Sequence, residues 1–201
     1  MGIIRKKIKS AFEGNGIIRV IQHSAEILKM APEALDKLFL AEYERVSQFK
    51  NKVDAENAMQ LFYNTMADGI ISERIYHNVT CTAGRTQIAQ ALGNNTPTAT
   101  YLYYCAVGTN NTAPAEADTT LNTELARKVI TLLSQSGKQV TARTYFTTAE
   151  AIGALKEVGH FMDDATAVAD SGTILDRSLI DVNKTSSIAL TILLTLDVDD
   201  A

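Results

Sequence analysis

Three histidines, two cysteines and several carboxylates are the side chains in this 201-residue chain that could take part in chemistry. His23, His77 and His160 stand far apart, and none has a second histidine, cysteine or carboxylate at a metal-ligand spacing such as HExxH. We therefore expect structural or surface histidines, and no metal site.

The two cysteines, Cys81 and Cys105, lack the CxxC spacing of a metal or redox site and are too few for a disulfide framework. Both are expected to be small buried hydrophobic residues. Serine, histidine and aspartate show no local pattern of a nucleophile with its base, and the chain has no GxSxG elbow or Walker loop. The sequence predicts that the protein is not an enzyme, with no catalytic, cofactor-binding or metal-binding residues.

Three further patterns approach known motifs without completing them. Residues 14–19 resemble a dinucleotide fingerprint but lack its third glycine and its βαβ setting, so a turn between helices is expected there. Calcium would require a turn glycine and a closing carboxylate, so these aspartates are expected to be solvated: Asp163, Asp164, Asp197, Asp199 and Asp200. Asn-x-Thr triplets, not expected to be glycosylated because a secretion signal is lacking, begin at Asn78, Asn94, Asn110 and Asn183.

The densest aromatic cluster is formed by Tyr101, Tyr103 and Tyr104. In a strand, Tyr101 and Tyr103 would face one way while Leu102 and Tyr104 face the other, so both faces require burial. One face is expected in the core, and the other against a helix or a neighbouring subunit. A stacking platform for a sugar or a base is the alternative, although the chain has no tryptophan.

Composition and charge limit the class of protein. Hydrophobic residues make up 46% of the chain and charged residues 21%, as in an ordinary globular protein. No apolar run approaches the ~18–20 residues of a membrane span, and the opening residues lack the apolar region of a signal peptide, so a soluble, non-secreted protein is expected. Lys6 also breaks a myristoylation signal. The net charge is −4, and the one basic cluster is expected to be a solvated helix face, not a nucleic-acid site: Arg5, Lys6, Lys7 and Lys9.

Hydrophobic periodicity divides the chain near Tyr76. Before it, spacings of three and four predict about four helices, so residues 1–75 are expected to be a helical docking or assembly region. The expected helices are Ile3–Phe12, Ile17–Met30, Ala31–Lys52 and one that begins near Asp54 as its N-cap and ends at Gly69.

After Tyr76 the period changes to two. Val140–Phe146 and Ile188–Leu196 alternate as half-buried strands, and one helix is expected over Ala83–Leu92. The sequence therefore predicts an α+β protein whose N-terminal helical region is followed by a mainly antiparallel β-sandwich over residues 76–201. Further strands are expected over Tyr76–Thr80, Tyr101–Val107, Lys128–Leu133, Leu155–Phe161 and Thr173–Ile180.

A series of short motifs runs through residues 78–198. The series resembles a family of tailed-bacteriophage structural proteins, usually described as tail, fibre or collar components. Its members, in chain order, are Gly84-Arg85 with Ile88, Ala89 and Leu92; Ala106-Val107-Gly108-Thr109; Thr112-Ala113-Pro114-Ala115; Asp118-Thr119, Leu121, Glu124 and Arg127; Phe146, Glu150-Ala151, Gly153, Leu155, Glu157, Gly159 and Phe161; Gly172-Thr173-Ile174-Leu175 with Arg177; and Lys184-Thr185-Ser186-Ser187 before the last apolar strand.

The resemblance implies a non-enzymatic structural subunit of a tailed-phage virion, located in the tail, neck or collar, or baseplate region. It implies assembly in many copies through contacts with itself and with other virion proteins, after synthesis in the host cytoplasm. No cofactor, small-molecule substrate, nucleic acid or membrane is expected as a partner. A receptor- or glycan-binding fibre module and a capsid decoration protein are the alternatives.

The sequence departs from the family pattern in two respects. His160 stands where the family usually has an aliphatic residue, and residues 1–75 lie outside the match. Glu157 and Arg127 are expected to pair across strands, as a contact that specifies the fold and has no catalytic role.

Overall fold

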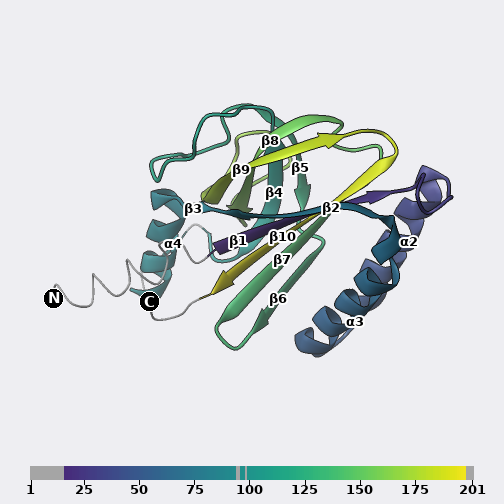
Figure 1. Cartoon of the computed structure of the whole chain (residues 1–201). Coiled ribbons are helices and arrows are strands. Elements are labelled where there is room, and N and C mark those ends of the chain that lie inside the picture. The colour runs from purple at the N-terminus through teal and green to yellow at the C-terminus, as the bar shows by residue number, and fades with distance from the viewer. Residues whose placement is uncertain (1–15, 94–95, 98, 198–201) are drawn as a thin grey trace.

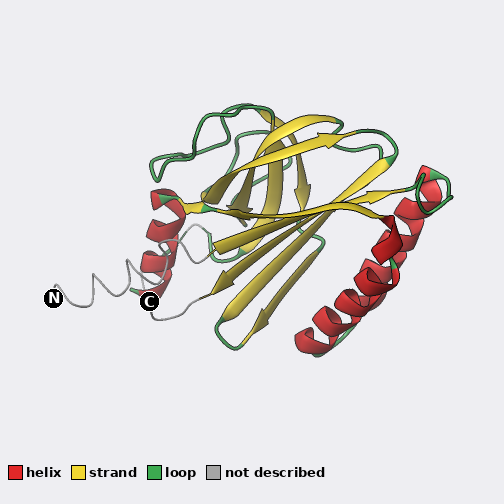
Figure 2. Ribbon diagram, viewed as in Figure 1, coloured by secondary structure: helices red, strands yellow, loops and turns green. Residues whose placement is uncertain are grey.

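The protein is an α+β fold built mainly from two antiparallel sheets that pack face to face (Figures 1 and 2). The computed structural model describes residues 16–93, 96–97 and 99–197. The first sheet has the strand order β2-β1-β10-β7-β6 and the second has the order β3-β9-β8-β4-β5. The predicted fold class is confirmed.

The strands of the first sheet are β1 (Gly16–Ser24), β2 (Ile70–His77), β6 (Leu132–Ser136), β7 (Gln139–Phe146) and β10 (Ile188–Asp197). The strands of the second sheet are β3 (Val79–Thr80), β4 (Leu102–Gly108), β5 (Glu124–Val129), β8 (Gly153–Met162) and β9 (Ile174–Lys184). The helices described are α2 (Pro32–Ser47), α3 (Lys52–Thr65), α4 (Thr82–Leu92) and the short 3-10 turn η1 (Ala67–Gly69).

The chain passes directly from one sheet to the other at two corners, which close the sandwich at both sides. Only Asn78 separates β2 from β3, and only Ile130 and Thr131 separate β5 from β6. At the second corner the Ile130 N–H donates to the carbonyl of Tyr103, and the Thr131 N–H donates to the carbonyl of Arg143, both at 2.8 Å. Because the two corners join the sheets, the sandwich is also a flattened barrel.

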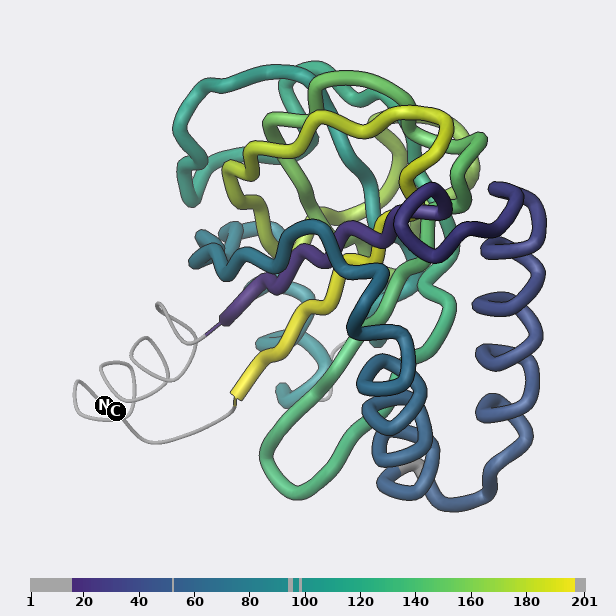
Figure 3. Tube along the Cα trace, turned by 45° about the vertical axis from the view of Figure 1, so that its right-hand side comes forward, coloured from purple at the N-terminus to yellow at the C-terminus, as the bar shows by residue number. Residues whose placement is uncertain are grey.

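The first sheet packs against another layer on each of its faces, except at the end of β1 and β2 away from the helices, where Ile17 and Ile75 are exposed. Its inner face packs on the second sheet, with Leu190 and Ile192 of β10 in the shared core. Its outer face carries α2 and α3, and Ala189 of β10 lies in that second cluster. Figure 3 shows the two helices as a hairpin beside this face. Apolar residues on successive positions of β10 follow from this double burial.

Specific polar contacts fasten the hairpin to the sheet. Glu56 of α3 accepts a hydrogen bond from Arg143 at 2.8 Å, and the Tyr63 hydroxyl lies 2.8 Å from that of Thr191. The Tyr145 hydroxyl donates to Asp36 of α2 at 2.9 Å. The hairpin is therefore joined to two strands, β7 and β10, that lie later in the chain.

Two helices are present as expected, but α2 ends at Ser47 and not at Lys52, α3 ends at Thr65 before the turn η1 and not at Gly69, and the N-cap of α3 also differs. Pro32 stands in the first turn of α2, where its missing N–H costs nothing. The N-cap of α3 is Asn51, whose side-chain oxygen accepts the Val53 N–H at 3.0 Å, so the expected cap at Asp54 is wrong. Asp54 lies instead in the first turn of α3, where a negative charge interacts favourably with the helix dipole.

The helix expected over Ile17–Met30 is wrong. Gly16–Ser24 form β1, which pairs with β10 on one side and β2 on the other, and residues 25–30 are turns. Because β1 is apolar toward both the barrel core and the hairpin, it lacks the alternation that identifies a half-buried strand. The helix expected over Ile3–Phe12 lies outside the described residues.

The boundary expected between residues 75 and 76 falls inside β2. The pairing of β1 with β10 runs from Gly16 opposite Leu196 to Ser24 opposite Ile188. Described residues on both sides of the expected boundary thus share one sheet and one core, and the interpretation of residues 1–75 as purely helical is wrong.

The other elements expected after Tyr76 are present, except that one expected strand is divided between two strands. The run expected as a single strand over Lys128–Leu133 spans the corner between β5 and β6. Expected elements that correspond to described ones are Tyr76–Thr80 with the end of β2 and β3, Tyr101–Val107 with β4, Val140–Phe146 with β7, Leu155–Phe161 with β8, Thr173–Ile180 with β9, Ile188–Leu196 with β10 and Ala83–Leu92 with α4.

Candidate functional site

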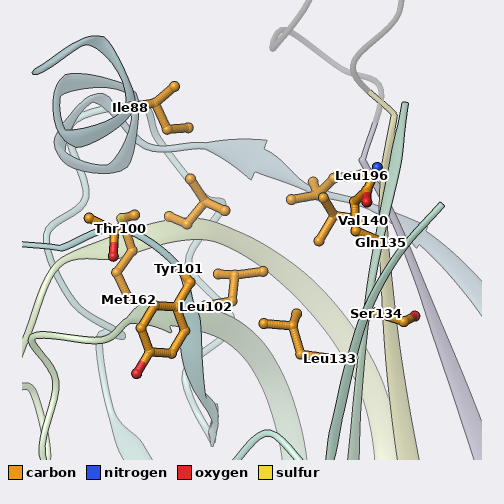
Figure 4. Close-up of a pocket in the computed structure, with 11 residues that line it drawn as sticks. Ile88, Thr100, Tyr101, Leu102, Leu133, Ser134, Gln135, Val140, Met162 and Leu196 are labelled. Atoms are coloured by element: carbon orange, nitrogen blue, oxygen red, sulfur yellow. The ribbon is translucent and has the colours of Figure 1, made fainter. Parts of the chain in front are cut away.

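An apolar cavity of about 480 Å³ lies at one end of the barrel (Figure 4). Strands β4, β7 and β9 begin there, and β6, β8 and β10 end there. The residues that line it are Ile88 of α4, Thr100, Tyr101, Leu102, Leu133, Ser134, Gln135, Val140, Met162, Leu175 and Leu196. Its volume is within the ~300–1,000 Å³ typical of ligand pockets.

The lining of this cavity limits what it can hold. Most of the lining side chains are aliphatic, and Tyr101 is the one titratable side chain among them. The hydroxyl of Ser134 donates to Glu56 on the hairpin at 2.9 Å, so it is already engaged outside the cavity. The cavity is suited to an apolar side chain or an apolar small molecule, and not to a charged substrate.

The tyrosine cluster lies beside the cavity, on β4 and the residues before it. Tyr101 and Tyr103 are exposed, with ring centroids 6.1 Å apart and edge-to-face, and Tyr103 and Tyr104 are related in the same way at 5.1 Å. Asp163 accepts the N–H of Thr100 at 2.6 Å, which orders the chain just before Tyr101. This is an exposed aromatic surface next to an apolar opening.

The expected orientation within this cluster is wrong at Tyr104. Leu102 lies in the core between the sheets, whereas Tyr104 packs on the outer side of the second sheet with Ala106 and Phe161. The register of β4 against β8 shifts between Leu102 and Tyr104. A one-residue irregularity turns the side chains that follow it to the other face of the sheet. The alternation of residues in the sequence therefore predicted the wrong face for Tyr104.

One set of reactive side chains comes together inside the barrel. His160 Nδ1 lies 2.8 Å from an oxygen of Asp176, and Cys105 is directly opposite His160 in the pairing of β4 with β8. All three residues are fully buried. Burial by itself lowers the pKa of His160, but the charge of Asp176, with a further contribution from Cys105, raises it to about 10. The buried carboxylate of Asp176 therefore favours the protonated form of His160.

A cysteine nucleophile, a histidine base and a carboxylate that orients the histidine are the groups that cysteine hydrolases use. Here the set is closed off from solvent. It lies deeper along the same three strands than the cavity residues Leu102, Met162 and Leu175. His160 Nε2 and the second oxygen of Asp176 have no hydrogen-bond partner in the structure. The arrangement gives a substrate no access to the thiol in this conformation.

Sequence reasoning missed this set because its members are neighbours across strands. Asp176 is sixteen positions from His160 along the chain, so no short motif contains both. The one signal was a histidine where the phage family usually has an aliphatic residue. Its buried carboxylate partner explains how this histidine is accommodated.

The motif residues of the phage resemblance form a second buried network. Arg177 is fully buried and donates to Glu157 at 2.8 Å and to Asp118 at 2.8 Å. Glu157 also accepts the N–H groups of Asn122 at 3.0 Å and Thr123 at 2.8 Å. The network fastens the long loop of residues 109–123 to β8 and β9.

The pairing expected between Glu157 and Arg127 is wrong. Arg127 pairs with Glu124 at 2.6 Å, and its guanidinium lies 4.7 Å from the centre of the Phe161 ring. Glu157 instead takes Arg177 from the neighbouring strand β9. The Glu157–Arg177 pair does join neighbouring strands, β8 and β9.

The other two histidines have different surroundings. His23 is buried against Phe39 and Tyr63, with ring centroids at 4.6 and 5.5 Å, and neither of its ring nitrogens has a hydrogen-bond partner. Burial lowers the pKa of His23 to about 4. His77 is exposed at the end of β2. Among the residues that the structure describes, no three histidine, cysteine, aspartate or glutamate side chains are arranged so that they could hold a metal ion.

The remaining singled-out residues have local structural contacts. Cys81 and Cys105 are free and buried as expected, and burial raises the pKa of Cys81 to about 12. Asp164 accepts the N–H of Thr173 at 2.8 Å, and Asp197 accepts from Gln139 at 2.9 Å, so both make specific contacts. The following lie outside the described residues: Arg5, Lys6, Lys7, Lys9, Asn94, Asp199 and Asp200.

None of the described helices is long and apolar enough to span a membrane. No family model, curated protein or solved structure gives a significant match to this chain. The resemblance to phage structural proteins therefore rests on the motifs of the sequence itself.

Proposed function

We propose that this protein is a non-enzymatic structural subunit of a tailed-phage virion, in its tail, neck or collar, or baseplate region. It assembles in many copies through contacts with itself and with other virion proteins. The ordered motifs over residues 78–198 support the phage part of this proposal. Four residues from these motifs belong to one buried network: Thr112, Asp118, Glu157 and Arg177. Contacts among motif residues are expected when the motifs belong to a common fold.

The observation that carries the assembly part is the exposure of large apolar side chains on a closed barrel. They occur on the hairpin, on α4, beside the cavity and on β1 and β2. Where such groups form a contiguous patch, they are typical of protein–protein contact sites. The main examples are Leu38, Leu61, Leu92, Tyr101, Tyr103, Ile17 and Ile75.

The position of the reactive side chains supports a role without catalysis. Cys105, His160 and Asp176 are sealed between the sheets, and the lining of the nearby cavity is almost entirely apolar. A hydrolase would present its nucleophile to a substrate.

The test is the composition of purified particles. We expect mass spectrometry of the virion to detect this protein in many copies, and electron microscopy with a gold-labelled C-terminal tag to place it at the tail, neck or baseplate. Labels at the capsid surface would instead favour a decoration protein. Absence of the protein from purified particles would overturn the proposal.

A receptor- or glycan-binding fibre module is the second candidate, and the exposed pair Tyr101 and Tyr103 favours it. Exposed aromatic rings beside polar groups are typical of carbohydrate sites. A glycan array separates the two functions. Binding that is lost with Tyr101→Ala and Tyr103→Ala, but kept with Leu92→Ala on exposed α4, would support the module; no binding would leave the structural role.

A further inference from the structure

We propose that the outer face of β1 and β2, at the end away from the helical hairpin, is a twofold contact between two copies of this chain. This inference deepens the proposed assembly role and rests on it. The contact is centred on Arg19 and Glu73 and flanked by Ile17 and Ile75.

The hairpin leaves this end of the sheet uncovered. Ile21 of β1 lies in the cluster under α2 and α3, but Ile17, four positions earlier and on the same face, is 37% exposed. Ile75 lies directly opposite Arg19 on β2 and is 56% exposed. Figure 1 shows the hairpin at the end of β1 and β2 where the chain passes into the helices.

The four side chains share one face of the sheet. Residues directly opposite each other in antiparallel strands point to the same side, and Arg19 is opposite Ile75 while Glu73 is opposite Ile21. Arg19 Nε lies 3.2 Å from a Glu73 oxygen, which confirms that their side chains meet. Their side chains remain 40% and 44% exposed, so each keeps room for a second partner.

Charge complementarity identifies a second copy as the occupant. In a twofold contact the same patch meets itself, so Arg19 of one copy faces Glu73 of the other, twice. A patch with one positive and one negative charge between two isoleucines is complementary to itself in this arrangement. Nucleic acid would require an excess of basic groups, and a sugar would favour aromatic side chains, neither of which this patch offers.

The test uses two charge-reversal variants of the full chain. Arg19→Glu leaves two acidic groups in the patch, and Glu73→Arg leaves two basic groups. We expect the wild-type protein to form a reversible dimer in sedimentation velocity, and each variant alone to dimerise at least tenfold more weakly. Mixing the two variants should restore the dimer, because each contact then joins Glu to Arg. With one variant labelled with ¹⁵N, native mass spectrometry should show the mixed dimer well above its statistical share.

Two controls make the result specific. Ile75→Asp should also weaken the dimer at least tenfold, whereas Val168→Asp in the loop between β8 and β9, where Val168 is 69% exposed, should not. Far-ultraviolet circular dichroism checks that every variant is folded. A wild-type monomer at all concentrations, a mixture that does not pair, or a dimer unaffected by Ile75→Asp would overturn this contact. None of these results bears on whether the protein is present in particles, which tests the proposed function separately.

Discussion

Arg177 of β9 and Glu157 of β8 form an ion pair at 2.8 Å, and both side chains are fully buried. The pair holds the loop of residues 109–123, because Glu157 accepts three backbone N–H groups of that loop and Arg177 donates to the carbonyl of Thr112 at 2.9 Å. Loss of either partner breaks this buried ion pair, and loss of Arg177 leaves Glu157 without a cation beside it. The stability of this side of the barrel therefore depends on the pair as a unit.

Replacement of Arg177 by Met should lower the free energy of unfolding by about 3–5 kcal/mol, because Glu157 is then buried without its cation. Urea unfolding of the full chain measures this change. Arg74→Met is the matched control: Arg74 is 55% exposed and its ion pair with Asp181 is 3.7 Å long, so a change within about 0.5 kcal/mol is expected. Equal effects of the two substitutions would contradict the role of the buried network.

Acid should destabilise the protein through His23. Burial lowers the pKa of His23 to about 4 in the folded state, below its ordinary value of 6.5, so the unfolded chain binds the proton first as the pH falls. Stability linked to His23 is therefore lost between about pH 6.5 and 4, and amounts to about 2 kcal/mol between pH 7 and pH 4.5.

The comparison of wild-type protein with His23→Leu isolates this effect, since all other titrating groups are shared. We expect urea unfolding at pH 7 and at pH 4.5 to show a larger loss of stability for the wild type. The same loss in both proteins would show that His23 accepts its proton without cost in the folded state.

Leu190 lies midway along β10, fully buried in the core between the two sheets. Replacement by Ala should cost about 2–5 kcal/mol, because it removes buried methyl groups and leaves a cavity. Thermal or urea unfolding measures the loss. Leu61→Ala, at an exposed position of α3, is the control and should change stability by less than about 0.5 kcal/mol.

Residues 76–201 alone should fail to fold. They lack β1, which pairs with β10 along its whole length, and they lack most of β2 and all of the hairpin. We expect no cooperative unfolding transition and little dispersion in the amide NMR spectrum of this fragment. A cooperative transition like that of the full chain would restore the division into two independent regions.

The two thiols should be unreactive in the native protein. Cys81 and Cys105 are both buried out of reach of a reagent, and burial raises the pKa of Cys81 to about 12, so little of the Cys81 thiolate is present at neutral pH. Ellman's reagent should modify neither residue until urea unfolds the chain, when both react. Rapid modification of Cys105 in the native state would reopen the possibility that the Cys105, His160 and Asp176 set is catalytic.

The sequence by itself determined the helices that are buried on one face only. The stripe of α2, with Leu35, Phe39 and Tyr43 toward the sheet, repeats at helical spacing because its other face meets solvent. In the same way, the expected helix over Ala83–Leu92 matches α4. Patterns of this kind are local, so one sequence is enough to reveal them.

Only the tertiary structure decided the elements and contacts that depend on distant partners. β1 is apolar toward both the core and the hairpin, so its residues carry no period that distinguishes a strand from a helix. The choice of Arg177 over Arg127 for Glu157 follows from the pairing of β8 with β9, and the meeting of His160 with Cys105 from the pairing of β4 with β8. Such contacts depend on register between strands, and register is set by the packing of the whole barrel.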